Sequence, residues 1–491
     1  MTTPLQRLLR QGGTYALGNA LLKLSGLLLA PLYLNPRWLS AKEYGYLILL
    51  EVTAQVGMLL AGAGVASGLL KYLSDVNYRT SWDELPFSAW SMVVLSAGGV
   101  LVLIWIGARP LTHILLSPEV PVRVVQLMGI YVFFKALGAI PFAVLRSRER
   151  AGWFVVAQSL ELMLLVAGVY YFLVVAGEHL IGVMKAYLYA SAASAGLLLI
   201  GMLRMVRPRI RMKWFWPLVR VGFPIALAGF ATLFLNMGDR YLLRWLAGTE
   251  SVAVYGWAAK FSGILNMLFV QSFQLAFAVI GLKKLSTSGD LSFFQRTFRQ
   301  YALWTGWAVL GLSLVAYDMT RILSRSETYL AVETLTFPIA AGFLFYGLYY
   351  ILANVLFARE YTRPLPVLVL LAALFNAGLN LVLIPVMGAL GAAIATLCSY
   401  ALLMVLTAWF MVRRWEVSFP WLVPVRVLVV VSVLFLVGHL SVEWSVWFRL
   451  GWRLSLILSY PFVLMVVGLL HRGEVPELLE QVRQVFRTSS R

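Results

Sequence analysis

Charged side chains deep within long apolar stretches are the residues of this chain best suited to chemistry. Three are lysines, Lys23, Lys135 and Lys260, and two are glutamates, Glu51 and Glu161. A buried ammonium group could bind an anionic group, of which phosphate and diphosphate are the usual examples. A buried carboxylate could take up and release a proton. Ionisable residues within apolar segments are rare and commonly mark such sites.

These five charges are too costly to face lipid. One charged side chain at the centre of a membrane helix costs about 2.5–3.5 kcal/mol, and five would cost more than the net stability of a typical protein. We therefore expect them to pair, as Lys23 with Glu51 or Lys135 with Glu161, or to line a hydrated and partly cationic cavity. Lys260 is the strongest candidate for substrate binding, because the second half of the chain has no equally deep acid to neutralise it.

A few polar residues near the apolar stretches are further candidates. Asp239 and Arg240 come at the end of one stretch, and Asn376 and Asn380 share a helix face because they are four residues apart. For the two asparagines, interhelical hydrogen bonding is favoured over substrate contact. The full set of candidate cavity residues is Lys23, Lys135, Lys260, Arg240, Asn376 and Asn380, and the candidates for ion coupling are Glu51, Glu161 and Asp239.

The elements that position these residues are predicted to be transmembrane helices. Hydrophobic residues make up 61% of the 491 residues and charged residues 12%. A helix needs ~20 mostly apolar residues to span a bilayer. About fourteen stretches qualify, at roughly 13–34, 44–68, 86–107, 124–145, 153–176, 180–203, 221–238, 252–281, 301–317, 334–357, 364–385, 389–411, 427–441 and 454–470. The fold class is therefore an all-α polytopic membrane protein.

Composition and motifs exclude several functions. The loops between the stretches are too short to fold as a catalytic domain. The single cysteine, Cys398, excludes an intrachain disulfide, and the four histidines lack the spacing of metal ligands. No glycine-rich phosphate loop of the ATPase type occurs. We expect no cofactor and no metal.

The net charge of +19 is predicted to reflect topology rather than nucleic-acid binding. With the N-terminus inside, the larger share of the 40 lysines and arginines falls in cytoplasmic segments, as the positive-inside rule requires. Both termini are then cytoplasmic. The surrounding membrane lipids are expected partners, and anionic headgroups would attract the basic loops.

A weak internal repeat divides the chain into two halves. Three features recur at an offset of about 210 residues and at the same point in the helix order. They are Tyr44-Gly45 with Tyr255-Gly256, Arg148-Glu149 with Arg359-Glu360, and Gly182 with Gly391. Because six helices separate the copies, the halves have the same orientation in the membrane. We expect a six-helix lobe at 1–206, a second at 207–412, and two further helices and a cytoplasmic tail at 413–491.

Three segments resemble signatures of the Wzx-type lipid-linked oligosaccharide flippases of the multidrug/oligosaccharidyl-lipid/polysaccharide exporter superfamily. They are NAGLNLVLIPVMGALGAAIAT at 376–396, DRYLLRWLAG with the following VYG at 239–256, and LSAKEYG at 39–45. The resemblance implies two six-helix lobes around a cationic central cavity. It also implies flipping of an undecaprenyl-diphosphate-linked oligosaccharide from the cytoplasmic to the periplasmic leaflet of the bacterial inner membrane, for surface polysaccharides such as O-antigen. Polysaccharide polymerase or assembly proteins would be partners, and the protein would not be an enzyme.

Two alternatives stay open at this point. A drug or cation antiporter of the same superfamily would favour an acidic binding site. A membrane glycan polymerase or ligase would need a sizeable outer loop with catalytic side chains, and the compact outer pair of Asp318 with Arg321 is a weak match.

Overall fold

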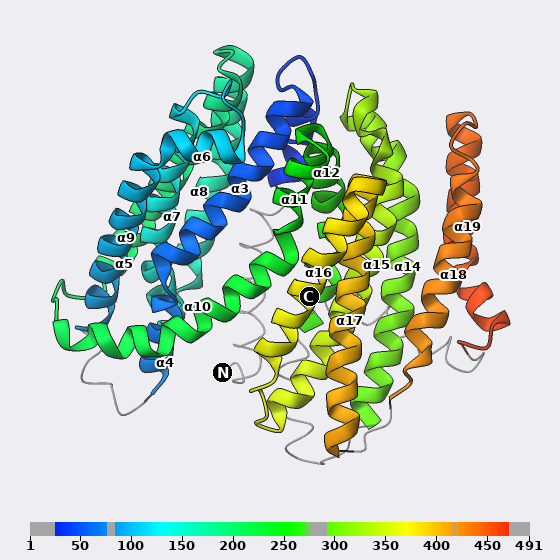
Figure 1. Ribbon diagram of the computed structural model, residues 1–491. Coiled ribbons are helices and arrows are strands. Elements are labelled where there is room, and N and C mark those ends of the chain that lie inside the picture. The colour runs from blue at the N-terminus through cyan, green and yellow to red at the C-terminus, as the bar shows by residue number, and fades with distance from the viewer. Residues whose placement is uncertain (1–24, 76–83, 272, 275–291, 416–418, 471–491) are drawn as a thin grey trace. The chain divides into compact units, whose positions relative to one another are not determined.

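The structure is a computed structural model that describes residues 25–75, 84–271, 273–274, 292–415 and 419–470 (Figure 1). These residues form helices and connecting segments, with no strand among them. The all-α polytopic class predicted from the sequence is confirmed.

Thirteen helices in the described part are long and apolar enough to cross a membrane. They are Ala41–Gly62, Leu85–Ile106, Arg123–Ser147, Gly152–Val175, His179–Leu203, Met212–Met237, Thr249–Gln271, Ser292–Leu323, Glu327–Ala358, Leu365–Met387, Ala389–Trp415, Leu422–His439 and Val446–Val466. Most of the first predicted stretch, 13–34, lies outside the described residues. The remaining predicted stretches each have a helix, and several helices are longer than predicted because polar residues at their ends are also helical.

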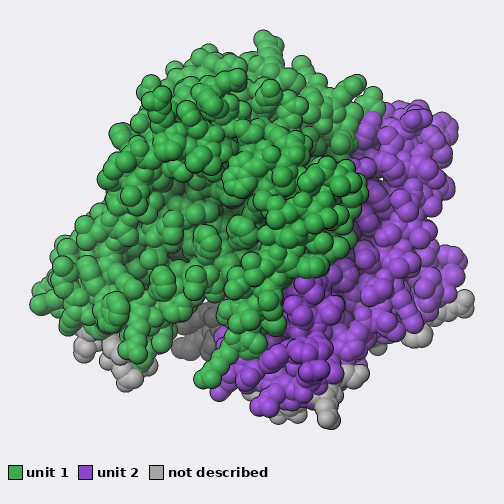
Figure 2. Space-filling view, in the orientation of Figure 1, with its two compact units in different colours: residues 1–261, 320–332, 363–399 green, residues 262–319, 333–362, 400–491 purple. Residues whose placement is uncertain are grey.

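The chain forms two compact units (Figure 2). Unit 1 contains residues 1–261, 320–332 and 363–399, and unit 2 contains residues 262–319, 333–362 and 400–491. These units are a different division of the chain from the predicted lobes, whose boundaries at 206 and 412 stay a prediction.

In unit 1, the second predicted stretch is two helices with a bend between them. Helix α3 (Ala41–Gly62) begins with a capping box, in which Ser40 Oγ accepts a hydrogen bond from Glu43 N and a Glu43 carboxylate oxygen accepts one from Ser40 N. Ala63 and Gly64 then adopt positive φ angles of 42° and 71°, which end α3 before α4 (Val65–Ser74) begins. A side chain at Gly64 would overlap the backbone of Gly222 in α10 (Phe215–Met237), so glycine is required there by both conformation and packing.

The repeated Tyr-Gly dipeptides lie where α3 crosses α12 (Thr249–Leu265). A Cβ atom on Gly45 would overlap the carbonyl group of Thr249, and one on Gly256 would overlap the side chain of Ile48. Each glycine therefore removes a side chain that would separate the two helices. This close crossing brings residues further along α3 and α12 within side-chain reach of each other.

Four more elements complete the part of unit 1 that positions the charged residues. Helix α7 (Arg123–Ser147) packs against α3, α5 (Leu85–Ile106) and α9 (His179–Leu203). Helix α8 (Ala151–Val169) packs along α9 and ends in a π-helical turn, η2 (Tyr170–Val175). The inner faces of α7, α8 and α9 thus line a common space.

The second repeated dipeptide has the same backbone geometry in both copies. Glu149 and Glu360 have φ angles of 58° and 56°. The next amide donates to the carbonyl five residues back, Arg150 N to Leu145 O and Tyr361 N to Leu356 O, both at 2.9 Å. Both copies end their helices with the left-handed cap of a Schellman motif, α7 in the first half and α15 (Val332–Ala358) in the second. The two halves of the chain therefore share this type of helix end as well as the Arg-Glu dipeptide.

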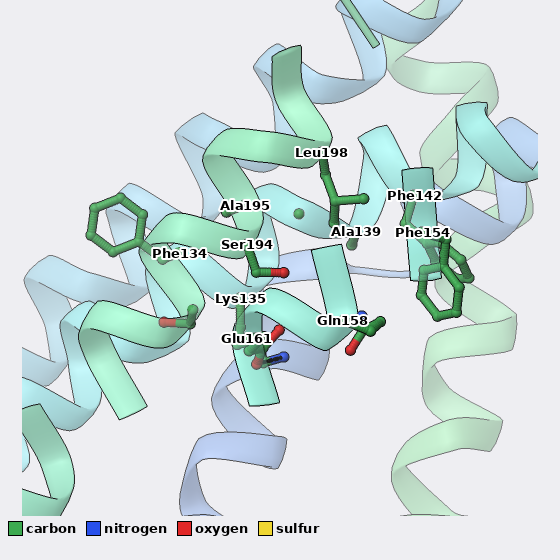
Figure 3. Close-up of a pocket in the computed structure, with 12 residues that line it drawn as sticks. Phe134, Lys135, Ala139, Phe142, Phe154, Gln158, Glu161, Ser194, Ala195 and Leu198 are labelled. Atoms are coloured by element: carbon green, nitrogen blue, oxygen red, sulfur yellow. Dashed lines mark ion pairs between the residues drawn. The ribbon is translucent and has the colours of Figure 1, made fainter. Parts of the chain in front are cut away.

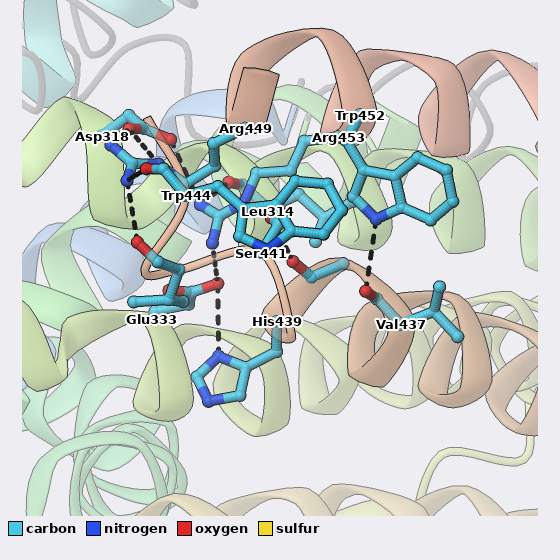
Figure 4. A network of polar contacts seen from close by, with 12 residues as sticks. Leu314, Asp318, Glu333, Val437, His439, Ser441, Trp444, Arg449, Trp452 and Arg453 are labelled. Carbon is cyan, nitrogen blue, oxygen red and sulfur yellow. Dashed lines mark hydrogen bonds and ion pairs between the residues drawn. The ribbon is translucent and has the colours of Figure 1, made fainter. Parts of the chain in front are cut away.

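Unit 2 contains a buried charge network that the sequence analysis missed (Figure 4). Arg449 and Arg453 of α19 (Val446–Val466) are only 1% and 2% exposed. Asp318 of α14 (Ser292–Leu323) accepts hydrogen bonds from Arg449 Nε at 2.9 Å, Arg449 Nη2 at 2.6 Å and Arg453 Nη1 at 3.1 Å. Glu333 of α15 accepts one from Arg453 Nη2 at 2.7 Å.

This network joins the C-terminal helices to the rest of unit 2. Two arginines and two carboxylates balance one another, and His439 at the end of α18 (Leu422–His439) lies 3.4 Å from Glu333. The predicted pairing of Asp318 with Arg321 is wrong, because Arg321 points to the exposed side of α14 while Asp318 is buried. No spacing in the sequence relates Asp318 to arginines about 130 residues away.

The α3–α12 crossing gives a first prediction. Gly45→Ala should lower the free energy of unfolding by about 1–3 kcal/mol, because the added methyl overlaps backbone that cannot move aside easily. Gly99→Ala in α5 is the matched control, since no atom lies within 4 Å of its added Cβ, and it should be neutral or stabilising. Thermal unfolding of the purified protein in detergent measures both. Equal melting temperatures for the two variants would contradict the packing argument.

The buried network gives a second prediction. Asp318→Asn should destabilise the protein by about 3–5 kcal/mol, because Arg449 and Arg453 would be left buried without a full counter-charge. Arg321→Ala, three residues along α14 and exposed, should change stability by less than about 0.5 kcal/mol. The same unfolding assay compares them, and an Asp318→Asn protein as stable as Arg321→Ala would show that the network does not hold these helices.

Candidate functional site

Five helices of unit 1 bring most of the deep charged residues into one polar band. The helices are α3, α7, α8, α9 and α12. We define the polar band as Glu51, Tyr131, Lys135, Gln158, Glu161, Tyr187, Ser191, Ser194 and Lys260. Helical spacing puts the members from one helix on one face: Tyr131 and Lys135 are four residues apart, and Gln158 and Glu161 are three apart.

One end of the polar band is an ion pair between α3 and α12. Lys260 Nζ lies 2.8 Å from Glu51 Oε2 and 2.9 Å from Oε1. The Tyr187 hydroxyl of α9 donates to Glu51 Oε1 at 2.8 Å, and the Tyr44 ring lies 5.5 Å from the Lys260 ammonium. The side chains of Lys260 and Glu51 stay 23% and 22% exposed, so this pair is not sealed within protein.

The expectation that Lys260 lacks an acidic partner is wrong. It considered only acids in the second half of the chain, whereas Glu51 comes from the first half. The Tyr-Gly crossing of α3 and α12 explains the difference, because it brings the two halves of the sequence together within unit 1.

The other end of the polar band is the ion pair of Lys135 with Glu161, one of the two pairings considered from the sequence. Glu161 is 5% exposed, whereas 23% of the Lys135 side chain is exposed. Both residues line a pocket of about 260 Å³ between α7, α8 and α9, together with Gln158, Ser191 and Ser194 (Figure 3). Pairing and a lined pocket, which the sequence analysis treated as alternatives, occur together here.

Two tyrosines connect these ion pairs. Tyr131, one turn before Lys135, has its ring 5.5 Å from that of Tyr187 in an edge-to-face arrangement. Tyr187 in turn binds Glu51. The sequence analysis did not select either tyrosine, although the spacing of Tyr131 and Lys135 on α7 was a signal that could have identified the first.

A second charged cluster forms around Asp239 in unit 1. Arg240 Nη1, from the start of α11 (Asp239–Leu246), lies 2.5 Å from Asp239 Oδ1, and the Tyr255 hydroxyl donates to Asp239 Oδ2. Thr396 of α17 (Ala389–Trp415) lies 3.4 Å from the same oxygen. Arg240 is 9% exposed and Asp239 1%. Arg240 is ion-paired, as Lys260 and Lys135 are, but its side chain is only 10% exposed against 23% for each lysine, so Arg240 is less available to a substrate.

The two asparagines of α16 (Leu365–Met387) bind each other rather than a neighbouring helix. Asn380 Nδ2 donates to the main-chain and side-chain oxygens of Asn376, both at 2.9 Å. The favoured interhelical bond is therefore not found, because the spacing of four residues lets the side chain reach the carbonyl one turn back. Asn376 Nδ2 and Asn380 Oδ1 are buried and have no hydrogen-bond partner in the described part of the chain.

Two further points complete the account of the predicted sites. Lys23 lies outside the described residues. Within the residues that the structure describes, no group of three or more histidine, cysteine, aspartate or glutamate side chains could hold a metal ion.

The basic loop before α10 is anchored at the end of α5. Loss of water around Glu84 acts to raise its pKa, but the positive charges of Arg211 and Lys213 outweigh this and hold that pKa below its usual value. Arg211 N also donates to Ser88 Oγ at 2.9 Å. These contacts fit the structural role expected for this loop.

Comparison with known proteins defines the class of protein to which this fold belongs. The structure of a "Lipid II flippase MurJ, inward closed conformation" is 14% identical, with a TM-score of 0.74 over 92% of this chain and 99% of that chain. An inward-facing multidrug resistance MATE family transporter of the MOP superfamily is 13% identical, with a TM-score of 0.63 over 80% of this chain and 94% of that chain. A MOP superfamily transporter from Pyrococcus furiosus is 14% identical, with a TM-score of 0.57 over 84% and 96%. At these identities the likeness shows a shared fold.

The family follows from the sequence match. The family described as "Polysaccharide biosynthesis protein" matches residues 8–278, more than half of the chain, and the protein belongs to it. No curated protein matches. This match confirms the polysaccharide-related family that the sequence signatures predicted, and the fold is shared with structures of the MOP superfamily.

The ion pair at the pocket gives a third prediction. Glu161→Leu should destabilise the protein by about 3–5 kcal/mol, because Lys135 loses its counter-charge in a mostly buried site. The double variant Lys135→Met with Glu161→Leu should recover most of that stability, since two apolar side chains can replace a buried pair. Thermal unfolding of both variants in detergent checks this. A double variant no more stable than Glu161→Leu would contradict a pairwise interaction.

Proposed function

We propose that this protein flips a polyprenyl-diphosphate-linked oligosaccharide from the cytoplasmic to the periplasmic leaflet of a bacterial inner membrane. Membership of a polysaccharide biosynthesis family and the fold shared with flippases and exporters support this proposal. The single observation that carries it is the pair of deep lysines, each neutralised by a glutamate yet still 23% exposed. A purely structural ion pair can often be replaced by apolar groups without loss of stability, so partly exposed charged pairs favour a role in binding.

Lys260 would bind the diphosphate by exchanging one counter-charge for another. In the absence of substrate, Glu51 supplies the counter-charge of the Lys260 ammonium. A diphosphate carries more negative charge than one carboxylate and can displace it. The hydroxyl of Tyr187 remains hydrogen-bonded to Glu51 and would stabilise the released carboxylate. The headgroup thus loses its water without ever lacking positive charge nearby, while the polyprenyl tail stays in lipid.

The exchange also provides a route to energy coupling. Proton exchange at Glu51 or Glu161 during the transport cycle would couple transport to a proton gradient. Asp239 is a third candidate for ion coupling. Without any ion exchange, outward movement of an anion is favoured by ~2.3 kcal/mol per charge per 100 mV when the cell interior is negative. ATP is not required for either route.

Alternating access would come from movement of the two predicted lobes, with both termini in the cytoplasm. Glu51 and Lys260 belong to different predicted lobes, and they are joined here together with the α3–α12 crossing. Displacement of Glu51 by the substrate would weaken this connection between lobes. Binding would therefore favour the conformational change that moves the headgroup.

A drug or cation antiporter is the second candidate. The fold shared with multidrug transporters and the buried acids Glu161 and Asp239 favour it. In the described structure, however, each acid is paired with a basic side chain, which opposes cation binding. An enzyme that polymerises or ligates glycans is not proposed, because Asp318 and the arginines around it are committed to packing.

The fourth prediction tests Lys260. In a strain that depends on this gene, Lys260→Ala should lower the rate of glycan export about tenfold to hundredfold, the loss expected for one charged hydrogen bond. Lipid-linked glycan should accumulate on the inner leaflet while the amount of protein in the membrane stays unchanged. Quantitative blotting of surface glycan and of the protein measures both.

Lys185→Ala is the matched control, because Lys185 also pairs with a glutamate in unit 1 but lies at the start of α9, outside the polar band. It should export glycan normally, because Lys185 lies outside the polar band that would bind the substrate. Normal glycan in the Lys260→Ala strain would remove this lysine from the mechanism. Loss of drug resistance in place of glycan would identify an antiporter.

A further inference from the structure

The pocket between α7, α8 and α9 has a lining that the diphosphate would not need. It lies within unit 1 and has a volume of about 260 Å³. A water molecule occupies about 30 Å³, and pockets for drug-sized ligands begin at about 300 Å³. The space is therefore far larger than a single water requires and suits one small ring.

The charges of the pocket favour a neutral ligand. Lys135 and Glu161 both line it and neutralise each other by direct contact. Glu161 is only 5% exposed and is less free to move away from Lys135 than the more exposed Glu51 is from Lys260, so a phosphate would gain little attraction from this pair. A metal cation would be repelled by the ammonium. Lys135 has two further N–H groups beyond the one that its pair with Glu161 needs, so it can donate to a neutral oxygen without giving up its partner.

The buried amide of Gln158 requires a hydrogen-bond donor from the ligand. Gln158 is 8% exposed and lines the pocket. Its Oε1 atom accepts no hydrogen bond from the residues that the structure describes. A buried acceptor without a partner costs about 1–3 kcal/mol, and an apolar ligand would leave that cost in place. A ligand that carries hydroxyl or amide N–H groups would remove it.

The remaining walls are apolar and aromatic on one side. Phe142 and Phe154 lie with ring centroids 4.3 Å apart and form one wall, and Phe134 adds a third ring to the lining. Ser194 adds a hydroxyl group from α9 (Figure 3). Figure 3 shows Lys135 and Glu161 close together, with Gln158 between this ion pair and the rings of Phe142 and Phe154. Polar groups interspersed with aromatic rings match a pyranose, which has hydroxyl edges and C–H faces.

We propose that this pocket is a monosaccharide subsite that binds one sugar residue of the transported glycan. The subsite rests on the proposed function for its physiological ligand, but the binding itself does not depend on flipping. It is joined to the Lys260 end of the polar band through Tyr131 and Tyr187, so a diphosphate and a nearby sugar residue could be held by one continuous set of side chains. Lys260 then recognises the diphosphate, which all polyprenyl diphosphates share, and the pocket with Lys135 recognises the glycan.

Binding of simple glycosides by the purified full chain tests this inference. The probes are methyl glycosides of glucose, galactose and N-acetylglucosamine, with sorbitol as an open-chain polyol, measured by saturation-transfer NMR in detergent micelles. At least one glycoside should bind, with the strongest saturation on the C–H protons of one ring face. Sorbitol should bind more weakly, because it offers the hydroxyl groups without a rigid ring.

Gln158→Leu removes the buried acceptor at similar volume and should weaken glycoside binding about tenfold. Gln126→Leu, a glutamine near the start of α7 that does not line the pocket, is the matched control and should bind normally. Ala139→Leu fills the pocket without removing a polar group and should abolish binding. It keeps the test decisive if Gln158→Leu does not fold.

The outcomes separate this inference from the proposed function. If no probe binds the wild type, or if Gln158→Leu and Ala139→Leu bind as the wild type does, the sugar subsite is overturned, whatever the flippase assay shows. A shift in the pH dependence of transport with unchanged glycoside binding would also overturn it and assign proton handling to the pocket. Glycoside binding that depends on Gln158, in a strain whose glycan export does not need this protein, would support the subsite and contradict the flippase.

Discussion

The cost of placing a charge in a hydrocarbon environment is the constraint on which the rest of this structure depends. Every deep charge that the structure describes in the polar band has an opposite charge in contact with it, Lys260 with Glu51 and Lys135 with Glu161. The arginines of α19 follow the same rule with Asp318 and Glu333. The difference between these groups is exposure, since the arginines are almost fully buried and the lysines are not. The same physical requirement thus produces a fixed connection in unit 2 and an exchangeable one in unit 1.

Exchangeability follows from the groups that surround each pair. Asp318 accepts three hydrogen bonds from two arginines, whose remaining N–H groups bind main-chain carbonyls and Ser441. Removing one partner there would leave many groups unpaired. Among the described residues, Glu51 contacts Lys260 and Tyr187, and both of these contacts can be replaced by a ligand or by water. A transporter of charged headgroups needs ion pairs of both kinds. The headgroup must be able to displace a charged side chain from its partner in the binding site, but it must not break the ion pairs that hold the helices together.

Sequence alone predicted the class, most of the helices and the charged residues of the site, because each depends on local information. Apolar length identifies a membrane helix, and a lysine within it is visible by inspection. The partners were less predictable. Glu51 and Lys260 are more than 200 residues apart, and they meet only because Gly45 and Gly256 let α3 and α12 approach closely. The Tyr-Gly repeat was visible in the sequence through its regular offset. In the structure, its two glycines allow the close contact between α3 and α12. Arg449 and Arg453 were not selected because they precede the predicted stretch 454–470, and no local pattern shows that they contact acids of α14 and α15.

The polar band and its pocket suggest how a protein of this kind could accept any polyprenyl diphosphate and still select among glycans. Coulomb attraction is strong but unspecific, so a lysine exposed beside a carboxylate accepts any diphosphate of sufficient charge. Hydrogen bonds to a buried amide discriminate well, because a ligand that fails to pair with Gln158 leaves the full cost of the unpaired acceptor. The charged contact and the hydrogen-bonding contact lie at opposite ends of the polar band. Affinity for the diphosphate and selection of the glycan would therefore depend on different residues. Residues at the pocket could then change during evolution without loss of the proposed charge exchange, and a change at Lys260 would affect every substrate alike.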